Sequence, residues 1–121
     1  YVDSVAAARD YLNTVDGNIL LTTGSKELHE FVGLDMSRVW ARVLPLASPL
    51  EACANAEIMP SHIIAAQGPF SNELNIAELR EIDAKWLVTK ASGKNGGFYE
   101  KLSAAEAVGT RDDNNKSGLR A

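Results

Sequence analysis

The chain has 121 residues, of which 45% are hydrophobic and 23% charged, and its formal net charge is −4. Such values are ordinary for one globular domain with a single core, and the negative charge argues against a nucleic-acid partner. Apolar runs fall well short of the roughly 20 residues that span a membrane, so no membrane partner is expected. Cys53 is the single cysteine, which excludes an internal disulfide and fits a reducing, cytoplasmic location.

Helices and strands are predicted to alternate from the N-terminus onward. Apolar residues at helical spacing after Ser4 indicate a first helix, which Gly17 ends. Residues 18–22 form a short apolar run that is typical of a buried strand. Small and polar residues follow this strand, and a helical pattern then predicts a second helix over residues 25–32.

A second strand and a third helix are predicted in the next segment. Residues 38–44 alternate apolar and polar side chains, as a half-buried strand does. Ser48 and Pro49 then have the character of an N-cap and a first helical position. We expect Leu50 and Cys53 to lie on the inner face of that helix.

The pattern repeats once more before the C-terminal part of the chain. Residues 62–66 are predicted to form a short apolar strand. Ser71 is placed to cap the helix that follows. We expect this helix to bear Leu74, Ala77 and Ile82.

The C-terminal part begins with a predicted strand over residues 85–89 and a Gly-rich loop. A further helix is expected after that loop and ends at Gly109. Its apolar face would be made by Phe98, Leu102, Ala105 and Val108. Residues 110–121 are strongly polar and are predicted to form a flexible tail.

The order of these elements predicts the fold class. Strands alternate with helices at βαβ spacing and no hairpin signal separates them, so we predict an α/β, Rossmann-like parallel sheet with helices on both faces over residues 1–109. Ligands bind such sheets beyond the carboxyl ends of the strands. Three loops at those ends carry unusual residues, and we predict that they share one rim of the sheet.

The first of these loops is suited to binding an anion. Its glycine permits a positive φ and a close approach of a ligand to the backbone. The predicted helix start beside it would offer free amides and a favourable dipole. The candidate cofactor- or substrate-binding residues are Thr22, Thr23, Gly24, Ser25 and Lys26. The alternative is a capped turn with an exposed lysine.

The second loop combines an amide, a rigid turn and an aromatic ring. Its candidate residues are Gln67, Gly68, Pro69, Phe70 and Ser71. The Phe70 ring could cover a planar ring of a ligand. The alternative is that Phe70 is a hydrophobic plug at the end of a strand.

The third loop combines lysines, glycines and the start of a predicted helix, which suits a phosphate group. Its glycine spacing matches neither a Walker motif nor Gly-x-Gly-x-x-Gly, and the alternative is an ordinary surface loop. The candidate residues are Thr89, Lys90, Ser92, Gly93, Lys94, Gly96 and Gly97.

Side chains for metal binding or acid–base catalysis are not evident in the sequence. His29 and His62 lack metal-ligand spacing and are interpreted as structural or exposed, and Cys53 is interpreted as a small core residue. Glu78 is one of several glutamates expected on solvated helix faces. The catalytic residues therefore stay unassigned, and no metal is expected.

Taken together, the segments occur in a specific order. They read ILLTTGSK (19–26), RVLP (42–45), IIAAQGPFS (63–71) with ELN (73–75), LVTK (87–90), SG (92–93), GGF (96–98) and EK (100–101). Each motif alone is unspecific, but the ordered set over about residues 1–109 resembles the precorrin-6A reductase family of cobalamin (vitamin B12) biosynthesis.

The resemblance implies a two-domain α/β oxidoreductase. It would use NADPH to reduce a double bond of the tetrapyrrole precorrin-6A, or of its cobalt form, in a cleft between the domains. It also implies that this sequence is the C-terminal half and that its partner is an N-terminal half with its own Gly-rich turn. Lysines of the rim would meet either the tetrapyrrole carboxylates or the NADPH phosphates, and the residues leave both open. Ala91, and the segment after Gly109, depart from the family pattern.

Two other functions stay open. With its N-terminal half absent, the chain could be a nucleotide- or anion-binding module without catalysis. It could also be a pairing domain, in which the face toward the other half drives formation of a homodimer.

Overall fold

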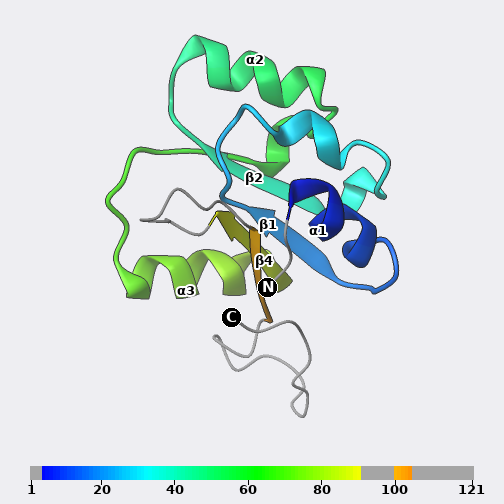
Figure 1. Ribbon diagram of the computed structural model, residues 1–121. Helices are drawn as coiled ribbons and strands as arrows, with labels where there is room; N and C mark the ends of the chain where they lie inside the picture. Colours follow the sequence, from blue (N-terminus) through cyan, green and yellow to red (C-terminus); the bar gives the residue numbers. More distant parts are fainter. Residues whose placement is uncertain (1–3, 91–99, 105–121) are drawn as a thin grey trace, which may run out of the picture.

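A computed structural model describes residues 4–90 and 100–104 of the chain (Figure 1). The elements are α1 (Val5–Leu12), β1 (Asn18–Leu21), the short 3-10 helices η1 (Leu28–Phe31) and η2 (Met36–Arg38), β2 (Val39–Val43), α2 (Ala47–Asn55), η3 (Pro60–His62), β3 (Ile63–Ala65), α3 (Asn72–Glu81), β4 (Ala84–Lys90) and β5 (Glu100–Ala104). The predicted strands therefore exist, and their ends differ from the predictions by at most one residue.

The strands form one sheet in the order β3-β2-β1-β4-β5. The first four are parallel, since β1 pairs in parallel with both β2 and β4, and β2 pairs in parallel with β3. Leu21, at the end of β1, has Ala41 and Val88 as its two cross-strand partners. The predicted α/β, Rossmann-like fold is confirmed for this part of the chain.

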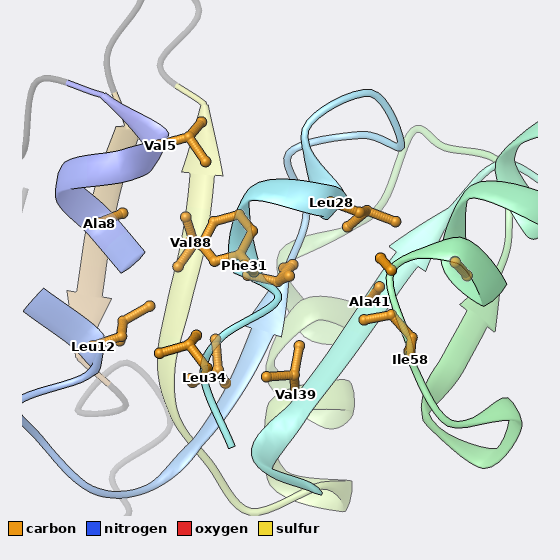
Figure 2. Close-up of a cluster of buried hydrophobic side chains, with 14 of the residues drawn as sticks. Val5, Ala8, Leu12, Leu28, Phe31, Leu34, Val39, Ala41, Ile58 and Val88 are labelled. Carbon is orange, nitrogen blue, oxygen red and sulfur yellow. The ribbon is translucent and has the colours of Figure 1, made fainter. Parts of the chain in front are cut away.

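Helices cover both faces of the sheet, as predicted (Figure 1). Successive strand residues point to opposite faces, so Ile19 and Leu21 pack with α1, η1 and α2, while Leu20 packs with α3. The α1 and α2 side holds the larger core. Figure 2 shows α1 side chains beside Val88 of β4, with Phe31 of η1 near the middle of the cluster.

The amino ends of the strands are joined by side chains that donate to backbone carbonyls. Asn18 Nδ2 donates to Ile82 O at 2.7 Å, and Trp86 Nε1 donates to Asp16 O at 2.9 Å. Arg38 Nε donates to Gly17 O at 2.8 Å. We call these three residues the amino-end clasp. They connect the starts of β1, β2 and β4 to the chain segments that precede β1 and β4.

The predicted helix over 25–32 is wrong in its extent. Only the four residues Leu28–Phe31 are helical, in 3-10 geometry. Leu28 and Phe31 are both almost fully buried, three residues apart on one face, and Gly33 follows with a φ of +126°. A single turn is enough to bury these two side chains, and the glycine then redirects the chain.

The ends and faces of the later helices also differ from the predictions. Leu46, and not Ser48, is the N-cap of α2, and Leu50 lies on its exposed face while Cys53 is buried. In α3, Ser71 is the N-cap as predicted, with its Oγ accepting from Leu74 N at 3.0 Å. Leu74 is 42% exposed and Ala77 is exposed, whereas Ile82 packs against the core together with Leu79 and Ile76.

The C-terminal prediction of a helix containing Leu102 is wrong for the described residues. Residues 100–104 form β5, which pairs antiparallel with β4, for example Val88 with Leu102. Without β5, one edge of β4 would leave a row of backbone groups without partners, and a strand satisfies them where a helix cannot. Phe98, Ala105, Val108 and the predicted tail lie outside the described residues.

Candidate functional site

The strand order makes β1 the point at which the chain changes the direction in which it adds strands to the sheet. The chain moves from β1 to β2 and β3 on one side, and then returns to β4 on the other side. Loops that leave neighbouring strands at such a point separate and form a crevice beyond the carboxyl ends. We call this edge of the sheet, with residues 22–26, 44–46 and 66–71, the carboxyl rim.

The turn after β1 is fastened to β4. Thr22 donates to Val88 O twice, from its N–H at 2.9 Å and from Oγ1 at 3.1 Å. Thr23 is 7% exposed. The hydroxyl hydrogen of Thr22 is therefore directed to the protein, and of the two threonines only Thr22 keeps appreciable contact with solvent.

Beyond the threonines the turn opens to solvent. Gly24 has a φ of +94°, and a Cβ placed on it would meet no atom of the described residues within 4 Å. The glycine is thus needed for its backbone conformation, and the space beside it is open. Ser25 is half-buried and Lys26 is exposed. Because η1 is a single 3-10 turn, the predicted helix-dipole contribution to anion binding is absent at this turn.

The loop after β3 continues the same rim. Ala66 N donates to Val43 O at 2.9 Å, which extends the β2–β3 ladder by one bond. Gln67, Gly68 and Pro69 are exposed, and the Gly68–Pro69 peptide is cis. Ser71 serves as the cap of α3, so its Oγ is already engaged with the backbone.

Phe70 does not point freely into solvent, because it lies against an arginine. The Arg42 guanidinium carbon is 3.8 Å from the centre of the Phe70 ring. Arg42 Nη1 also donates to Asn75 Oδ1 and Glu78 Oε1 of α3, both at 2.7 Å. The expectation that Glu78 lies on a solvated helix face is wrong, since only 14% of its side chain is exposed.

The third predicted loop begins at the end of β4, the other neighbour of β1. Thr89 is a half-buried residue of β4, and Lys90 is the last residue of that strand. Both lie on the same edge of the sheet as the turn after β1. The remaining candidates, Ser92, Gly93, Lys94, Gly96 and Gly97, lie outside the described residues.

Two features of the rim were not predicted from the sequence. One is the Arg42 network, which joins the RVLP and GPFS segments; the clustering of these motifs was the available signal. The other is a group of exposed leucines after β2, with Leu44 46%, Leu46 58% and Leu50 39% exposed. In the sequence, these leucines were indicated by an apolar run, interrupted by Pro45, at a place where a loop usually has polar residues.

A separate groove lies on the α3 side of the sheet and contains none of the predicted site residues. Its volume is about 430 Å³, and Trp40, Ile64, Ile82, Ser61, Glu78 and Glu81 line it. Trp40 stacks on His62 with ring centres 3.6 Å apart, and His62 Nδ1 lies 2.9 Å from Val39 O. The interpretation of His62 as structural is thereby confirmed.

Other titratable groups give no sign of a catalytic centre in the described part of the chain. No group of three or more His, Cys, Asp or Glu residues there is arranged to hold a metal ion. Cys53 is buried, and burial raises the pKa of its thiol, which agrees with a core role. Hydrogen bonds from Ser37 lower the pKa of the exposed Asp35 carboxyl. No described helix is long and apolar enough to cross a membrane.

Comparison with known proteins gives consistent matches. The family described as Precorrin-6x reductase CbiJ/CobK matches residues 1–111. Cobalt-precorrin-6A reductase from Methanothermobacter thermautotrophicus is 50% identical over 76 residues, which cover 63% of this chain and 25% of the relative. The Salmonella typhimurium enzyme of the same name is 38% identical over 100 residues, covering 82% and 38%. The one from Priestia megaterium is 39% identical over 97 residues, covering 77% and 38%.

The chain thus spans between 25% and 38% of the length of these relatives. No solved structure matches the chain at a significant level.

Proposed function

The chain belongs to the precorrin-6x reductase CbiJ/CobK family, and we propose that it forms one wall of the active site of an NADPH-dependent precorrin-6A reductase in cobalamin biosynthesis. The observation that carries the proposal is the family match over residues 1–111. The substrate would be precorrin-6A or its cobalt form, and the location would be the cytoplasm. The other wall would come from the part of the relatives' length that this chain does not span.

The reaction requires little acid–base chemistry from the protein. When bound, NADPH would supply the hydride that reduces an electron-poor carbon of the conjugated macrocycle, and a proton would add to a neighbouring atom. The residues of the rim would bind and orient the two molecules. This division of roles agrees with a rim built from amides, hydroxyls and a lysine, with no paired carboxylates.

The turn after β1 fits an anionic group. Open space beside Gly24 leaves room for a ligand close to the backbone, and Lys26 supplies a positive charge that is exposed to solvent. Such a charge would attract either a phosphate of NADPH or a carboxylate of the tetrapyrrole. The Ser25 hydroxyl would add a hydrogen-bond donor, whereas the Thr22 hydroxyl already donates to Val88 O.

Calorimetric titration of the 121-residue chain with NADPH, and separately with a carboxylated porphyrin, tests the proposal. We expect Lys26→Gln to weaken binding of at least one probe by about fivefold, with a loss that shrinks at high salt because the contact is exposed. Lys85→Gln is the matched control, since Lys85 lies beside Gly17 at the opposite edge of the sheet. Failure of the unmodified chain to bind either probe would count heavily against the proposal.

A binding module without catalysis is the second candidate. The observations that favour it are the open space beside Gly24 and the exposed Lys26, which suit an anion and assign no catalytic side chain. It predicts that the chain binds NADPH or a porphyrin but gives no NADPH oxidation, even at high protein concentration. Turnover by the chain alone would exclude it.

A pairing domain is the third candidate, and the exposed leucines at positions 44, 46 and 50 favour it. Apolar side chains gathered at one rim are typical of a surface that a partner covers. Sedimentation velocity at increasing concentration tests this function. Strictly monomeric behaviour would exclude a homodimer, and a dimer that Leu46→Asp dissociates would support it.

A further inference from the structure

The densest set of polar contacts at the carboxyl rim is centred on Arg42. Its Nη1 donates at 2.7 Å to both Asn75 Oδ1 and Glu78 Oε1, while the plane of the same guanidinium covers the Phe70 ring. One side chain of β2 therefore holds the loop after β3 and the first two turns of α3. These contacts connect residues that are 28 to 36 positions apart in the chain.

The charge of Arg42 is already matched within the protein. Only 12% of the Arg42 side chain and 14% of the Glu78 side chain are exposed. A guanidinium that is desolvated and paired with a carboxylate has little attraction left for a second anion. Arg42 is therefore suited to shaping the rim, and less suited to binding a phosphate or carboxylate itself.

The Phe70 ring lies between Arg42 and the backbone of the loop. A Cβ built on Gly68 would lie 2.9 Å from Cε2 and 3.0 Å from Cδ2 of Phe70. The ring thus fills the space beside Gly68 on one side and meets the guanidinium of Arg42 on the other. Displacing the ring would change the course of residues 67–71.

We propose that Arg42 is a positioning residue that holds residues 67–71 in the shape that receives the ligand. The loop would contact an uncharged part of that ligand, because it presents the Gln67 amide and the exposed Gly68–Pro69 backbone beside a neutralised arginine. Anionic groups would go to the turn that carries Lys26. This inference rests on the proposed function and adds a division of the rim into a neutral part and a charged part.

Arg42→Lys is the decisive variant, since lysine keeps the charge beside Glu78 but has no plane to cover the Phe70 ring. Arg38→Lys is its matched control, because Arg38 is also half-buried and donates to Gly17 O and Leu12 O at the other edge of the sheet. The first measurement is amide hydrogen exchange of the 121-residue chain. Ala66, Leu74 and Asn75 are the reporters, because their amides have hydrogen-bond partners on either side of the loop.

We expect exchange at these three amides to be about tenfold faster in Arg42→Lys than in Arg38→Lys, which is the effect of one lost contact of ordinary strength. The second measurement is calorimetric titration with NADPH and with a carboxylated porphyrin. We expect Arg42→Lys to weaken binding of the affected probe by about tenfold, while Arg38→Lys leaves it unchanged. The weakened binding should not depend on salt more than that of the unmodified chain, because the contact is with an uncharged group.

Equal exchange in the two variants would overturn the positioning role. Faster exchange with unchanged binding would overturn the contact between loop and ligand. If the unmodified chain binds neither probe, the proposed function and the ligand contact fail together, and exchange alone still decides whether Arg42 positions the loop. Phe70→Leu is the second variant: it removes the ring face without disturbing the pair between Arg42 and Glu78, and it should reproduce both effects.

Discussion

The amino ends of the strands, which form the amino edge, differ from the carboxyl rim in what their side chains bind. At the amino edge, the clasp residues Asn18, Arg38 and Trp86 donate to main-chain carbonyls of the segments that precede β1 or follow α3. At the carboxyl rim, Arg42 binds other side chains, and Lys26 and Leu46 are exposed. At the amino edge, side chains therefore link one backbone segment to another. At the carboxyl rim, side chains bind other side chains or lie exposed to solvent.

This difference indicates a division of work between the two edges. The clasp side chains stabilise one path of the chain, because each donates to a main-chain carbonyl. An exposed leucine or lysine contributes little to folding, so its substitution at the rim should change stability little. We therefore expect substitutions at the amino edge to change stability, and substitutions at the rim to change binding.

The largest effect is expected from Trp86→Ala at the amino edge. Trp86 is 2% exposed, donates to Asp16 O and meets the Tyr11 ring edge-on with ring centres 5.5 Å apart. Removing so large a buried side chain costs about 3–5 kcal/mol, which urea unfolding would measure. Trp86→Phe should cost less, because it keeps most of the ring and loses the hydrogen bond. A loss below 1 kcal/mol for Trp86→Ala would contradict the stabilising role of this edge.

The next effect is expected from Arg42→Ala, because Arg42 stabilises the fold although it lies at the carboxyl rim. The change leaves Glu78 largely buried without its partner, and such losses cost about 3 kcal/mol at the low end of their range. Removing both charges in Arg42→Met with Glu78→Leu should restore much of the stability, since apolar pairs replace buried ion pairs well. If urea unfolding shows the double variant to be as unstable as Arg42→Ala, the lost stability has another origin.

A smaller loss is expected from Gly24→Ala at the rim. Among the described residues alanine would have space there, because a Cβ meets none of their atoms within 4 Å, but the φ of +94° is unfavourable for any residue with a side chain. The expected cost is about 1–2 kcal/mol, measured by urea unfolding. Gly17→Ala is the comparison at the amino edge, where the Cβ would also lie 2.7 Å from Lys85 Cβ; it should cost more.

The smallest effect is expected from Leu46→Asn, and its sign is opposite. Leu46 is the N-cap of α2 and makes no side-chain hydrogen bond there, and it is 58% exposed. Asparagine would accept from the first turn of the helix and raise stability by about 0.5–1 kcal/mol. Thermal unfolding would measure the gain. If stability falls instead, Leu46 has a structural role, and its exposure no longer supports a partner surface at the rim.

Local patterns were sufficient to predict much of this fold. Alternation over residues 38–44 indicated a half-buried strand, and Ser71 was predicted to cap the helix that follows it. The alternation of strands and helices then predicted parallel pairing and the shared rim. These inferences succeed because caps and strand alternation depend on residues close together in the sequence.

Other features depend on contacts that no local pattern contains. The composition of residues 100–104 is compatible with a helix or a strand. They form a strand because they pair with the open edge of β4. In the same way, Glu78 has the character of a surface residue until α3 packs over β2 and brings it to Arg42. Leu74 and Leu79 are both apolar, and the sheet decides which of them is buried.

The sequence by itself therefore determined the α/β class, the family and the position of the turn after β1, because each depends on local residue order. The tertiary structure decided how the rim is divided. It fastened Thr22 to β4, left Gly24 and Lys26 open to solvent, and placed Phe70 on the neutralised guanidinium of Arg42. Desolvation and charge pairing act between residues that meet only after folding, so these roles follow from the packing of β2, β4 and α3.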